Sequence, residues 1–383
     1  MEEQFANSIK DLERLRKFSD DEMKVLEASD RAADEIAEPE YEHYLKHEFN
    51  SEAPGILAKH NLLGIPIKKE YGGLEMPPII SALEKERLGQ LGLGLSSFIN
   101  VQVFLCAQTI QRWGTEEQKS EYLPKAVRKE KVFAFGLTEP EAGSDPASLK
   151  TQYKKEGDRY IINGTKYLIS NGTIADYILV FARSAENPGT ISAILVDAKS
   201  AGLSRMELRE KIGLFTSDTG MLDFENVAAP KENMIGPEGR GMPVAYSALL
   251  NARLGVAAGC VGVIEASLNA SLKRSRERVQ HGKQIGKHQL IQQHISAMRQ
   301  NLEMARWPTY FAAIRKGEYE SNPNDKALME EVEVHGGFGY SLMSPVGQLF
   351  CDSRVARIYE GTDEIQDLKI ASSILGEGFE AYS

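Results

Sequence analysis

A glutamate near the end of the chain is placed where its carboxylate could act as a base. Glu360 lies between Tyr359 and Gly361 in the stretch "RIYEGTDEIQ" at residues 357–366. Because glycine has no Cβ, a ligand could lie close to the backbone beside that carboxylate. A solvated carboxylate in a surface turn is the alternative interpretation of these residues alone. The other motifs of the chain must decide between the two.

Two segments carry hydroxyl groups that could face a polar ring or a phosphate. In "LTEPEAGSDPASLKT", Thr138, Ser144 and Asp145 flank a glycine after a predicted strand, and hydroxyls and free N–H groups there could bind such a ligand. In "KYLISNG", Ser170 ends a predicted strand before an Asn-Gly turn and could reach the same ring. An ordinary loop and an ordinary hairpin turn explain these segments equally well when each is taken alone.

Two later segments could bind a diphosphate or let the backbone approach a ligand. In "RERVQHGKQIGKHQ", Arg278 and Gln289 lie between two long predicted helices, and a guanidinium group forms paired bonds with phosphate oxygens. In "EVHGGFGY", His335 lies beside Gly336 and Gly337. Solvated basic residues at a helix end and a glycine helix cap are the alternatives.

The hydrophobic pattern predicts three regions that would position these motifs. Helical spacing of apolar residues covers residues 1–130, short β-rich runs between turn signals cover 131–238, and long amphipathic helices cover 239–383. We therefore predict an α+β multidomain fold with an N-terminal α-helical domain, a middle antiparallel β-domain and a C-terminal α-helical bundle. The polar motifs cluster where these domains would meet, which is a usual place for a ligand cleft.

Composition narrows the possible partners and the location. The 383 residues include 45 basic and 55 acidic side chains, a net charge of −10, which argues against a nucleic-acid partner. No uninterrupted apolar run reaches the ~18–20 residues of a membrane span, and the opening residues lack signal-peptide or transit-peptide features. Three scattered cysteines and seven histidines without metal-binding spacing argue against disulfides and a metal site. We expect a cytoplasmic protein without a membrane span.

Taken together, the motifs resemble the acyl-CoA dehydrogenase family over essentially the whole chain. The matching stretches are "GIPIKKEYGG", "GLTEPEAGSD", "RVQHGKQIGKHQ", "HGGFGY" and "RIYEGTDEIQ". The resemblance implies a homotetramer whose subunits each bind FAD and oxidise an acyl-CoA thioester to the 2,3-enoyl-CoA, in fatty acid or amino acid catabolism. It also implies that the electrons pass to electron-transfer flavoprotein.

The resemblance also implies a role for each motif residue. Glu360 would remove the α-proton of the thioester while the β-hydrogen leaves as hydride to the flavin. Its backbone N–H and a flavin ribityl hydroxyl would hold the thioester oxygen. The implied FAD contacts are Leu137, Thr138, Ser144, Leu168, Ser170, Arg278, Gln289, Glu333, Gly336, Gly337, Thr362 and Glu364. The implied substrate contacts are Ser96, Ser144, Asn251, Arg253 and Gly361.

Three positions at the flavin depart from the family pattern. Leu168 stands where relatives commonly have a tryptophan that shields the flavin, Glu333 replaces a glutamine, and His281 replaces a phenylalanine. Oxidases pass electrons to O₂, and a flavin-site change such as Leu168 could permit this, so an acyl-CoA oxidase or a related flavin oxidase of the same fold is the alternative. A non-catalytic flavoprotein binding module is a remote alternative, which the acidic charge and Glu360 disfavour.

Two further features predict the substrate and the assembly. In "LNARLGVAAG" and "GSDPASLKT" the chain is closest to the glutaryl-CoA dehydrogenase branch, but Ser96 stands at the position of that branch's carboxylate-anchoring arginine. An unpaired carboxylate is costly to bury, so we expect a neutral short or branched acyl group. Residues 318–334 are shorter than the equivalent helical segment of relatives by about three turns. We therefore expect tetramer assembly and FAD retention to be coupled and weaker than is usual in the family.

Overall fold

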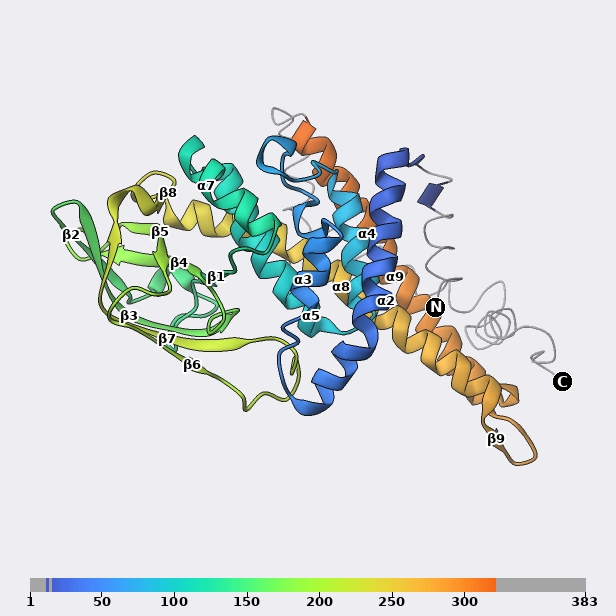
Figure 1. Cartoon of the computed structure of the whole chain (residues 1–383). Helices are drawn as coiled ribbons and strands as arrows, with labels where there is room; N and C mark the ends of the chain where they lie inside the picture. Colours follow the sequence, from blue (N-terminus) through green and yellow to red (C-terminus); the bar gives the residue numbers. More distant parts are fainter. Residues whose placement is uncertain (1–11, 14–15, 322–383) are drawn as a thin grey trace, which may run out of the picture. The chain divides into compact units, whose positions relative to one another are not determined.

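The computed structural model describes residues 12–13 and 16–321 (Figure 1). The described residues fall into two compact units, one up to Gly262 and one from Val263 onward. The long helix α8 (Gly241–Glu277) runs from the first unit into the second. The predicted domain limits at residues 130 and 238 are not tested by this division and stay predictions.

The first unit begins with helices, as the sequence predicts. Helix α2 starts after Ser19, whose hydroxyl accepts the backbone N–H of Glu22 at 3.3 Å while the Glu22 carboxylate accepts the Ser19 N–H at 2.8 Å. This reciprocal cap satisfies two N–H groups that a helix start leaves free. The elements are α2 (Asp20–Lys46), α3 (Ala53–Lys59), η1 (Leu62–Gly64), η2 (Lys69–Tyr71), α4 (Pro78–Gly89), α5 (Leu93–Ile99), the π-helix η3 (Asn100–Ala107), α6 (Gln108–Trp113) and α7 (Glu116–Val127).

Helix α4 is the most deeply buried of these elements. All its residues from Ile79 to Gly89 are buried, charged side chains included. Its backbone also touches that of α8, because a Cβ on Gly89 would lie 2.4 Å from the carbonyl oxygen of Gly259. Such a contact leaves no room for a side chain at position 89.

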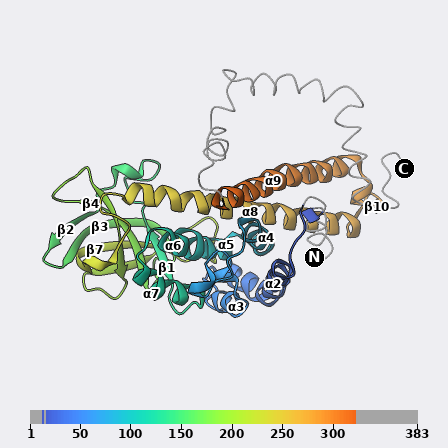
Figure 2. The same ribbon diagram turned by 90° about the horizontal axis from the view of Figure 1, so that it is seen from above.

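The strands that follow form the predicted β-domain. They are β1 (Phe133–Gly136), β2 (Gln152–Glu156), β3 (Arg159–Ser170), β4 (Tyr177–Ser184), β5 (Ile191–Asp197), β6 (Leu203–Glu207), β7 (Thr219–Pro230) and β8 (Met234–Ile235). The sheet has the order β6-β7-β3-β2-β4-β5-β8, with β1 also paired to β4. Figure 2 shows β2, β3, β4 and β7 of this sheet close together. Most pairs are antiparallel, while β4 lies parallel to β1 and to β2.

Buried apolar clusters cover both faces of this sheet, and the side chains of successive strand residues point to opposite faces. Leu179 and Phe181 of β4 pack in a cluster with Tyr122 and Leu123 of α7, while Ile178 of the same strand belongs to a second buried cluster. This alternation follows from the two-residue period of a strand. The first cluster therefore joins the sheet to the helices of the first unit.

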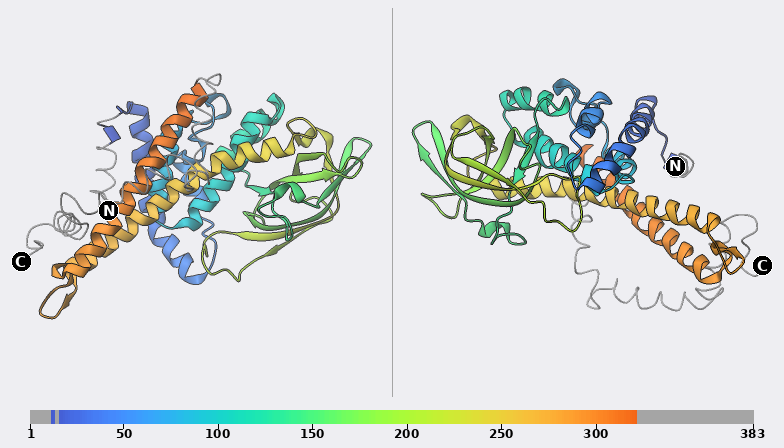
Figure 3. Two further views of the ribbon diagram at one scale, coloured as in Figure 1. Left: turned by 180° about the vertical axis from the view of Figure 1, so that it is seen from behind. Right: turned by 60° about the horizontal axis from the view of Figure 1, so that its bottom comes forward.

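The second unit contains the end of α8 and the helix α9 (Gln289–Ser321), which lie side by side (Figure 3). Between them are β9 (Val279–Gln280), β10 (Lys283–Gln284) and η6 (Ile285–Lys287). The Arg306 guanidinium lies 2.9 Å from the Glu265 carboxylate, and both side chains are almost wholly buried. The two helices are thus joined by a buried ion pair as well as by apolar contacts.

Two helical stretches of the described chain have the length and apolar composition of a membrane span. They are Leu93–Trp113 and Gly241–Glu277. In the first, 78% of the most apolar window is buried inside the protein, and in the second 39% is buried. Core helices of soluble proteins reach such compositions as well, so the predicted absence of a membrane span remains a prediction.

The contact between α4 and α8 leads to a stability prediction. Gly89→Ala should lower the free energy of unfolding by about 1–3 kcal/mol, because the added methyl group would overlap the Gly259 carbonyl. Gly55→Ala in α3 is the matched control: no atom lies within 4 Å of the Cβ it would add. The control should be neutral or stabilising by up to about 1 kcal/mol. Urea unfolding of both variants tests this, and equal midpoints would contradict it.

Candidate functional site

The segment after β1 is held against strand β3 by its backbone. The carbonyl oxygen of Leu137 accepts a hydrogen bond from Lys166 Nζ at 3.0 Å. The carbonyl oxygen of Thr138 accepts one from the backbone N–H of Tyr167 at 2.9 Å. Leu137 is buried and Thr138 is half-buried. Two of the residues that the resemblance assigns to FAD therefore have a fixed backbone next to β3.

A buried ion pair is the centre of this arrangement. Lys166 Nζ lies 2.8 Å from the Glu139 carboxylate, and the two side chains are 0% and 4% exposed. The same carboxylate accepts the backbone N–H groups of Lys150 at 2.5 Å and Thr151 at 2.9 Å. Glu139 thus ties together the segment after β1, the start of β2 and the middle of β3.

Burial and ion pairing have opposite effects on the pKa values of Lys166 and Glu139. Burial lowers the pKa of the Lys166 ammonium to about 8, against the opposing effect of Glu139. Burial alone would raise the pKa of the Glu139 carboxyl, but Lys166 and the N–H donors outweigh it, and the pKa is below its usual value. Both groups are therefore charged at pH 7, which preserves the pair.

A bulge in β3 turns Leu168 outward. The pairing of β3 with β7 shifts register between Lys166 and Ile169, and Leu168 has a φ of 56°. A leucine with positive φ is uncommon, and a bulge of this kind redirects the side chains around it. The Leu168 side chain is 55% exposed. The residue that replaces the usual tryptophan is therefore an exposed leucine, two residues from Lys166.

The next predicted FAD contact lies beside a helix of the first unit. Ser170 Oγ lies 3.4 Å from Ser97 Oγ of α5. The structure therefore brings together Leu137, Thr138, Leu168 and Ser170 around β3, with α5 alongside. Ser144 is exposed in the loop between β1 and β2. No described contact joins it to this group.

Ser96 has a partner that the sequence analysis missed. Its hydroxyl oxygen accepts a hydrogen bond from Lys85 Nζ at 2.6 Å, and its carbonyl oxygen accepts a second one from the same amine. Lys85 is wholly buried and Ser96 is 3% exposed. A lysine in an amphipathic pattern is usually solvated, and no feature of the α4 sequence would have identified this one as buried beside Ser96.

Two more of the predicted substrate residues lie on α8 within the first unit. Asn251 is half-buried and Arg253 is exposed. In the second unit, Arg278 and Gln289 are exposed near the base of the β9–β10 hairpin, where the Arg278 carbonyl accepts the Ile285 N–H at 2.8 Å. Positive φ angles at His281 and Gly282 form the turn of this hairpin.

Several predicted residues lie outside the described part of the chain. They are Glu333, His335, Gly336, Gly337, Glu360, Gly361, Thr362 and Glu364. Among the residues that the structure does describe, no group of three or more His, Cys, Asp or Glu side chains could hold a metal ion. The described cysteines, Cys106 and Cys260, are free thiols.

In the described chain, helices precede and follow a β-domain, and a hydrogen-bonded backbone with nearby hydroxyl groups lies along strand β3. Three family models match consecutive parts of the chain. They are described as acyl-CoA dehydrogenase N-terminal domain, at residues 19–130, middle domain, at 134–227, and C-terminal domain, at 239–375. The chain belongs to the acyl-CoA dehydrogenase family, so it is an oxidoreductase that acts on a CH–CH bond of an acyl-CoA.

Relatives with known names are similar to this chain over almost its full length. The short-chain specific acyl-CoA dehydrogenase of Clostridium acetobutylicum is 34% identical, covering 94% of this chain and 96% of the relative. Butyryl-CoA dehydrogenase from Megasphaera elsdenii is 31% identical with a TM-score of 0.76, covering 94% and 99%. A chain solved in work on the electron transferring flavoprotein of Acidaminococcus fermentans is 32% identical with a TM-score of 0.77, covering 94% and 98%.

FAD is the cofactor of this family, and the residues around β3 fit it. An acyl-CoA dehydrogenase from Bacillus anthracis complexed with FAD is 28% identical with a TM-score of 0.76, covering 92% of this chain and 66% of that one. Here, the half-buried Thr138 and Ser170 present hydroxyl groups beside a backbone that the Lys166–Glu139 pair holds in place. Hydroxyl and N–H donors of this kind suit the polar edge of a flavin ring.

The Lys166–Glu139 pair leads to a prediction about FAD retention. Lys166→Met should lower stability by about 3–5 kcal/mol, because it leaves the Glu139 carboxylate buried without its partner. The neutral double variant Lys166→Met/Glu139→Gln should recover part of that loss. Both variants should still lose FAD, because the Leu137 carbonyl no longer has its donor. Flavin absorbance per protein after gel filtration, with urea unfolding, measures the two effects.

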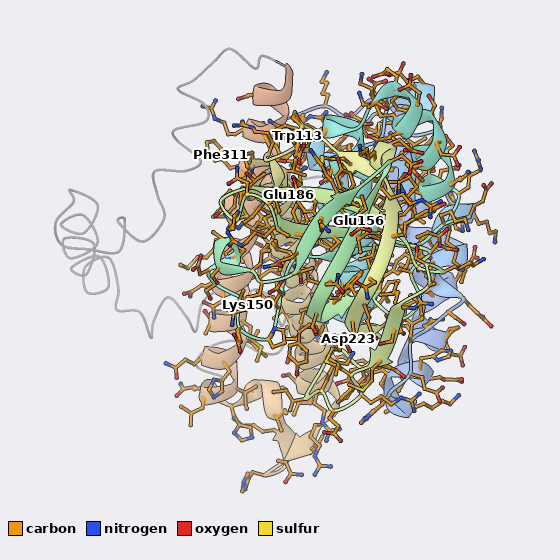
Figure 4. The ribbon with its side chains drawn as sticks, turned by 90° about the vertical axis from the view of Figure 1, so that its left-hand side faces the viewer. Trp113, Lys150, Glu156, Glu186, Asp223 and Phe311 are labelled. Carbon is orange, nitrogen blue, oxygen red and sulfur yellow. The ribbon has the colours of Figure 1, made fainter. Side chains whose placement is uncertain are left out.

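Lys150→Met is the matched control for this experiment. Lys150, labelled in Figure 4 with Glu156 of β2 and Asp223 of β7, forms an ion pair with Glu141 in which both side chains are about 70% exposed. An exposed pair contributes about 0–1 kcal/mol, so the control should keep its FAD. A double variant that also stays fully flavinated would show that the buried pair does not position the FAD segment.

Proposed function

We propose that the protein catalyses FAD-dependent α,β-dehydrogenation of an acyl-CoA thioester to the 2,3-enoyl-CoA and passes the electrons to electron-transfer flavoprotein. The observation that carries the proposal is the clamped segment from Leu137 to Glu139 beside Ser170, in a chain of the acyl-CoA dehydrogenase family. The similarity to a chain solved in work on an electron transferring flavoprotein supports the choice of acceptor. We also propose a cytoplasmic homotetramer, for which the sequence alone is the basis.

In the proposed reaction the substrate loses two hydrogens, one as a proton and one as a hydride, and each goes to a different acceptor. Glu360 takes the α-proton on its carboxylate, and the electrons of that C–H bond form the new double bond. FAD, when bound, supplies the acceptor for the β-hydride. The Glu360 backbone N–H would stabilise the thioester oxygen as negative charge develops there. Thr138 and Ser170 would orient the ring, since the Thr138 carbonyl is hydrogen-bonded to Tyr167 of β3 and Ser170 is the last residue of that strand.

One observation favours a second candidate, a flavin oxidase of the same fold. Leu168 is exposed on its bulge and is smaller than the tryptophan that shields the flavin in many relatives. Less shielding would favour reaction of the reduced flavin with O₂. No comparable observation supports a non-catalytic binding module, and the net charge of −10 disfavours one that binds nucleic acid.

The role of Glu360 is tested by Glu360→Gln. The amide keeps the shape of the side chain but cannot accept the α-proton, so the variant should stay yellow with bound FAD while turnover falls. A positioned base contributes about 10²–10⁴-fold, so the loss should be at least that large. Acyl-CoA turnover per bound flavin is the measurement. A variant with more than a tenth of the wild-type rate would remove Glu360 from this role.

The electron acceptor is tested by Leu168→Trp. If exposure of the flavin edge permits reaction with O₂, the larger side chain should lower the rate with O₂ and leave the rate with electron-transfer flavoprotein intact. Leu214→Trp is the matched control, because Leu214 is also exposed and has a φ of 54°. Negligible wild-type turnover with O₂ would exclude the oxidase. Turnover with O₂ alone would contradict electron-transfer flavoprotein as the acceptor.

A further inference from the structure

An arginine of strand β4 holds the exposed loop that contains Ser144. Arg183 Nε donates to the Leu149 carbonyl at 3.1 Å, and Nη2 donates to the Ala147 carbonyl at 2.6 Å. The remaining nitrogen, Nη1, donates to the carbonyl of Pro188 in the turn between β4 and β5. A guanidinium group suits these three acceptors, because its N–H donors point in fixed directions from one plane. The β1–β2 loop and the β4–β5 turn are therefore joined through one side chain.

The backbone that carries this guanidinium group is fixed on both sides. Arg183 is paired with Gln152 of β2 and with Ile191 of β5. Its N–H also donates to the Thr151 carbonyl at 2.8 Å. A residue paired with two neighbouring strands has little freedom to move, whereas an exposed loop has few contacts of its own. Arg183 thus holds the exposed loop around Ser144 from a fixed position in the sheet.

The other end of the loop is held at Ala142, which is 2% exposed. Its N–H and C=O exchange hydrogen bonds with Glu139 at 3.2 and 3.0 Å. Residues 143–145 lie between this contact and the Ala147 carbonyl. Neither their N–H groups nor the Ser144 hydroxyl make a hydrogen bond to another residue of the described chain. These polar groups are therefore available to a ligand, and the contacts at Ala142 and Ala147 determine where they lie.

The course of the loop relates it to the substrate of the proposed reaction. The loop begins at Glu139, which pairs with Lys166 beside the proposed flavin segment, and it reaches the surface at Ser144. The thioester of an acyl-CoA must lie at the flavin to react, so the rest of coenzyme A extends away from there. That part of the molecule carries amide, hydroxyl and phosphate groups, which accept hydrogen bonds from hydroxyl and N–H donors.

We propose that Arg183 is a positioning residue for the coenzyme A arm of the substrate, and that it acts by holding residues 143–149 in place without touching the substrate itself. The proposal rests on the proposed function, since it concerns how the same site binds an acyl-CoA. All three acceptors of Arg183 are neutral carbonyl oxygens. Its contribution is therefore the geometry of its three nitrogens. A lysine, whose donors share one nitrogen, keeps the charge but not this geometry.

Steady-state kinetics of the FAD-loaded enzyme with two thioesters of one acyl group tests the proposal. One is the acyl-CoA that the wild type oxidises fastest in a chain-length panel, and the other is the N-acetylcysteamine thioester of the same acid, which lacks most of the coenzyme A arm. The measured quantity is kcat/KM for the CoA ester divided by kcat/KM for the truncated ester. Arg183→Met and Arg183→Lys should each lower this ratio by roughly 3–10-fold, as for the loss of one hydrogen bond.

The loss should appear in KM for the acyl-CoA, with kcat little changed, because the arm does not react. The inhibition constant of free coenzyme A should rise by the same factor, which measures binding of the arm without the truncated ester. Arg159→Met is the matched control, at an arginine of β3 in the same sheet whose side chain is 64% exposed. It should leave the ratio and the inhibition constant unchanged.

A double variant separates positioning from a general structural role. Ser144→Ala should lower the ratio in the wild type but have less effect when Arg183 is already replaced, because both changes remove the same contact. If Arg183→Met does not fold, Arg183→Lys with and without Ser144→Ala gives the same comparison.

Three results would overturn the inference and leave the proposed function standing. They are a wild-type ratio and inhibition constant in Arg183→Lys, equal losses with the CoA ester and the truncated ester, and additive effects of the changes at Arg183 and Ser144. Failure of the FAD-loaded wild type to turn over any acyl-CoA of the panel would contradict the proposed function instead.

Discussion

The arrangement around the proposed flavin segment depends on one buried ion pair, that between Lys166 and Glu139. The carboxylate accepts bonds from Lys166 and from two backbone N–H groups, while the amine also binds the Leu137 carbonyl. Three separate stretches of chain therefore meet at two side chains. Because a charge buried without its partner costs several kcal/mol, the folded state keeps this geometry or loses much of its stability.

The same constraint explains where strain is found. Lys166 must point inward to reach Glu139, whereas Ser170 ends the strand beside α5. The pairing of β3 with β7 shifts register between Lys166 and Ile169, which is between these two contacts. Leu168 lies in this shifted stretch and has a positive φ, which is uncommon for leucine. The exposed Leu168 therefore lies on the short stretch of β3 between these two contacts.

A second buried charge, Lys85, differs from the first in its partners. Lys166 is matched by an anion, but Lys85 is matched by the neutral oxygens of Ser96. Every residue of α4 from Ile79 to Gly89 is buried, and Lys85 is not exposed to solvent. The Lys166–Glu139 pair has a structural role, since it connects β3 to the segments after β1 and before β2. Among the described hydrogen bonds, Lys85 therefore has no carboxylate acceptor, whereas Lys166 has one.

The sequence by itself determined the fold class, the family and the cofactor, because hydrophobic periodicity and contiguous motifs are local properties. It also identified Leu137, Thr138 and Ser170, which the structure brings together around β3. It could not reveal Lys85, since Lys85 and Ser96 are separated in sequence and only the packing of α4 against α5 and α8 makes them neighbours. The bulge at Leu168 and the burial of Lys85 beside Ser96 were decided by tertiary structure, because each depends on contacts between distant segments.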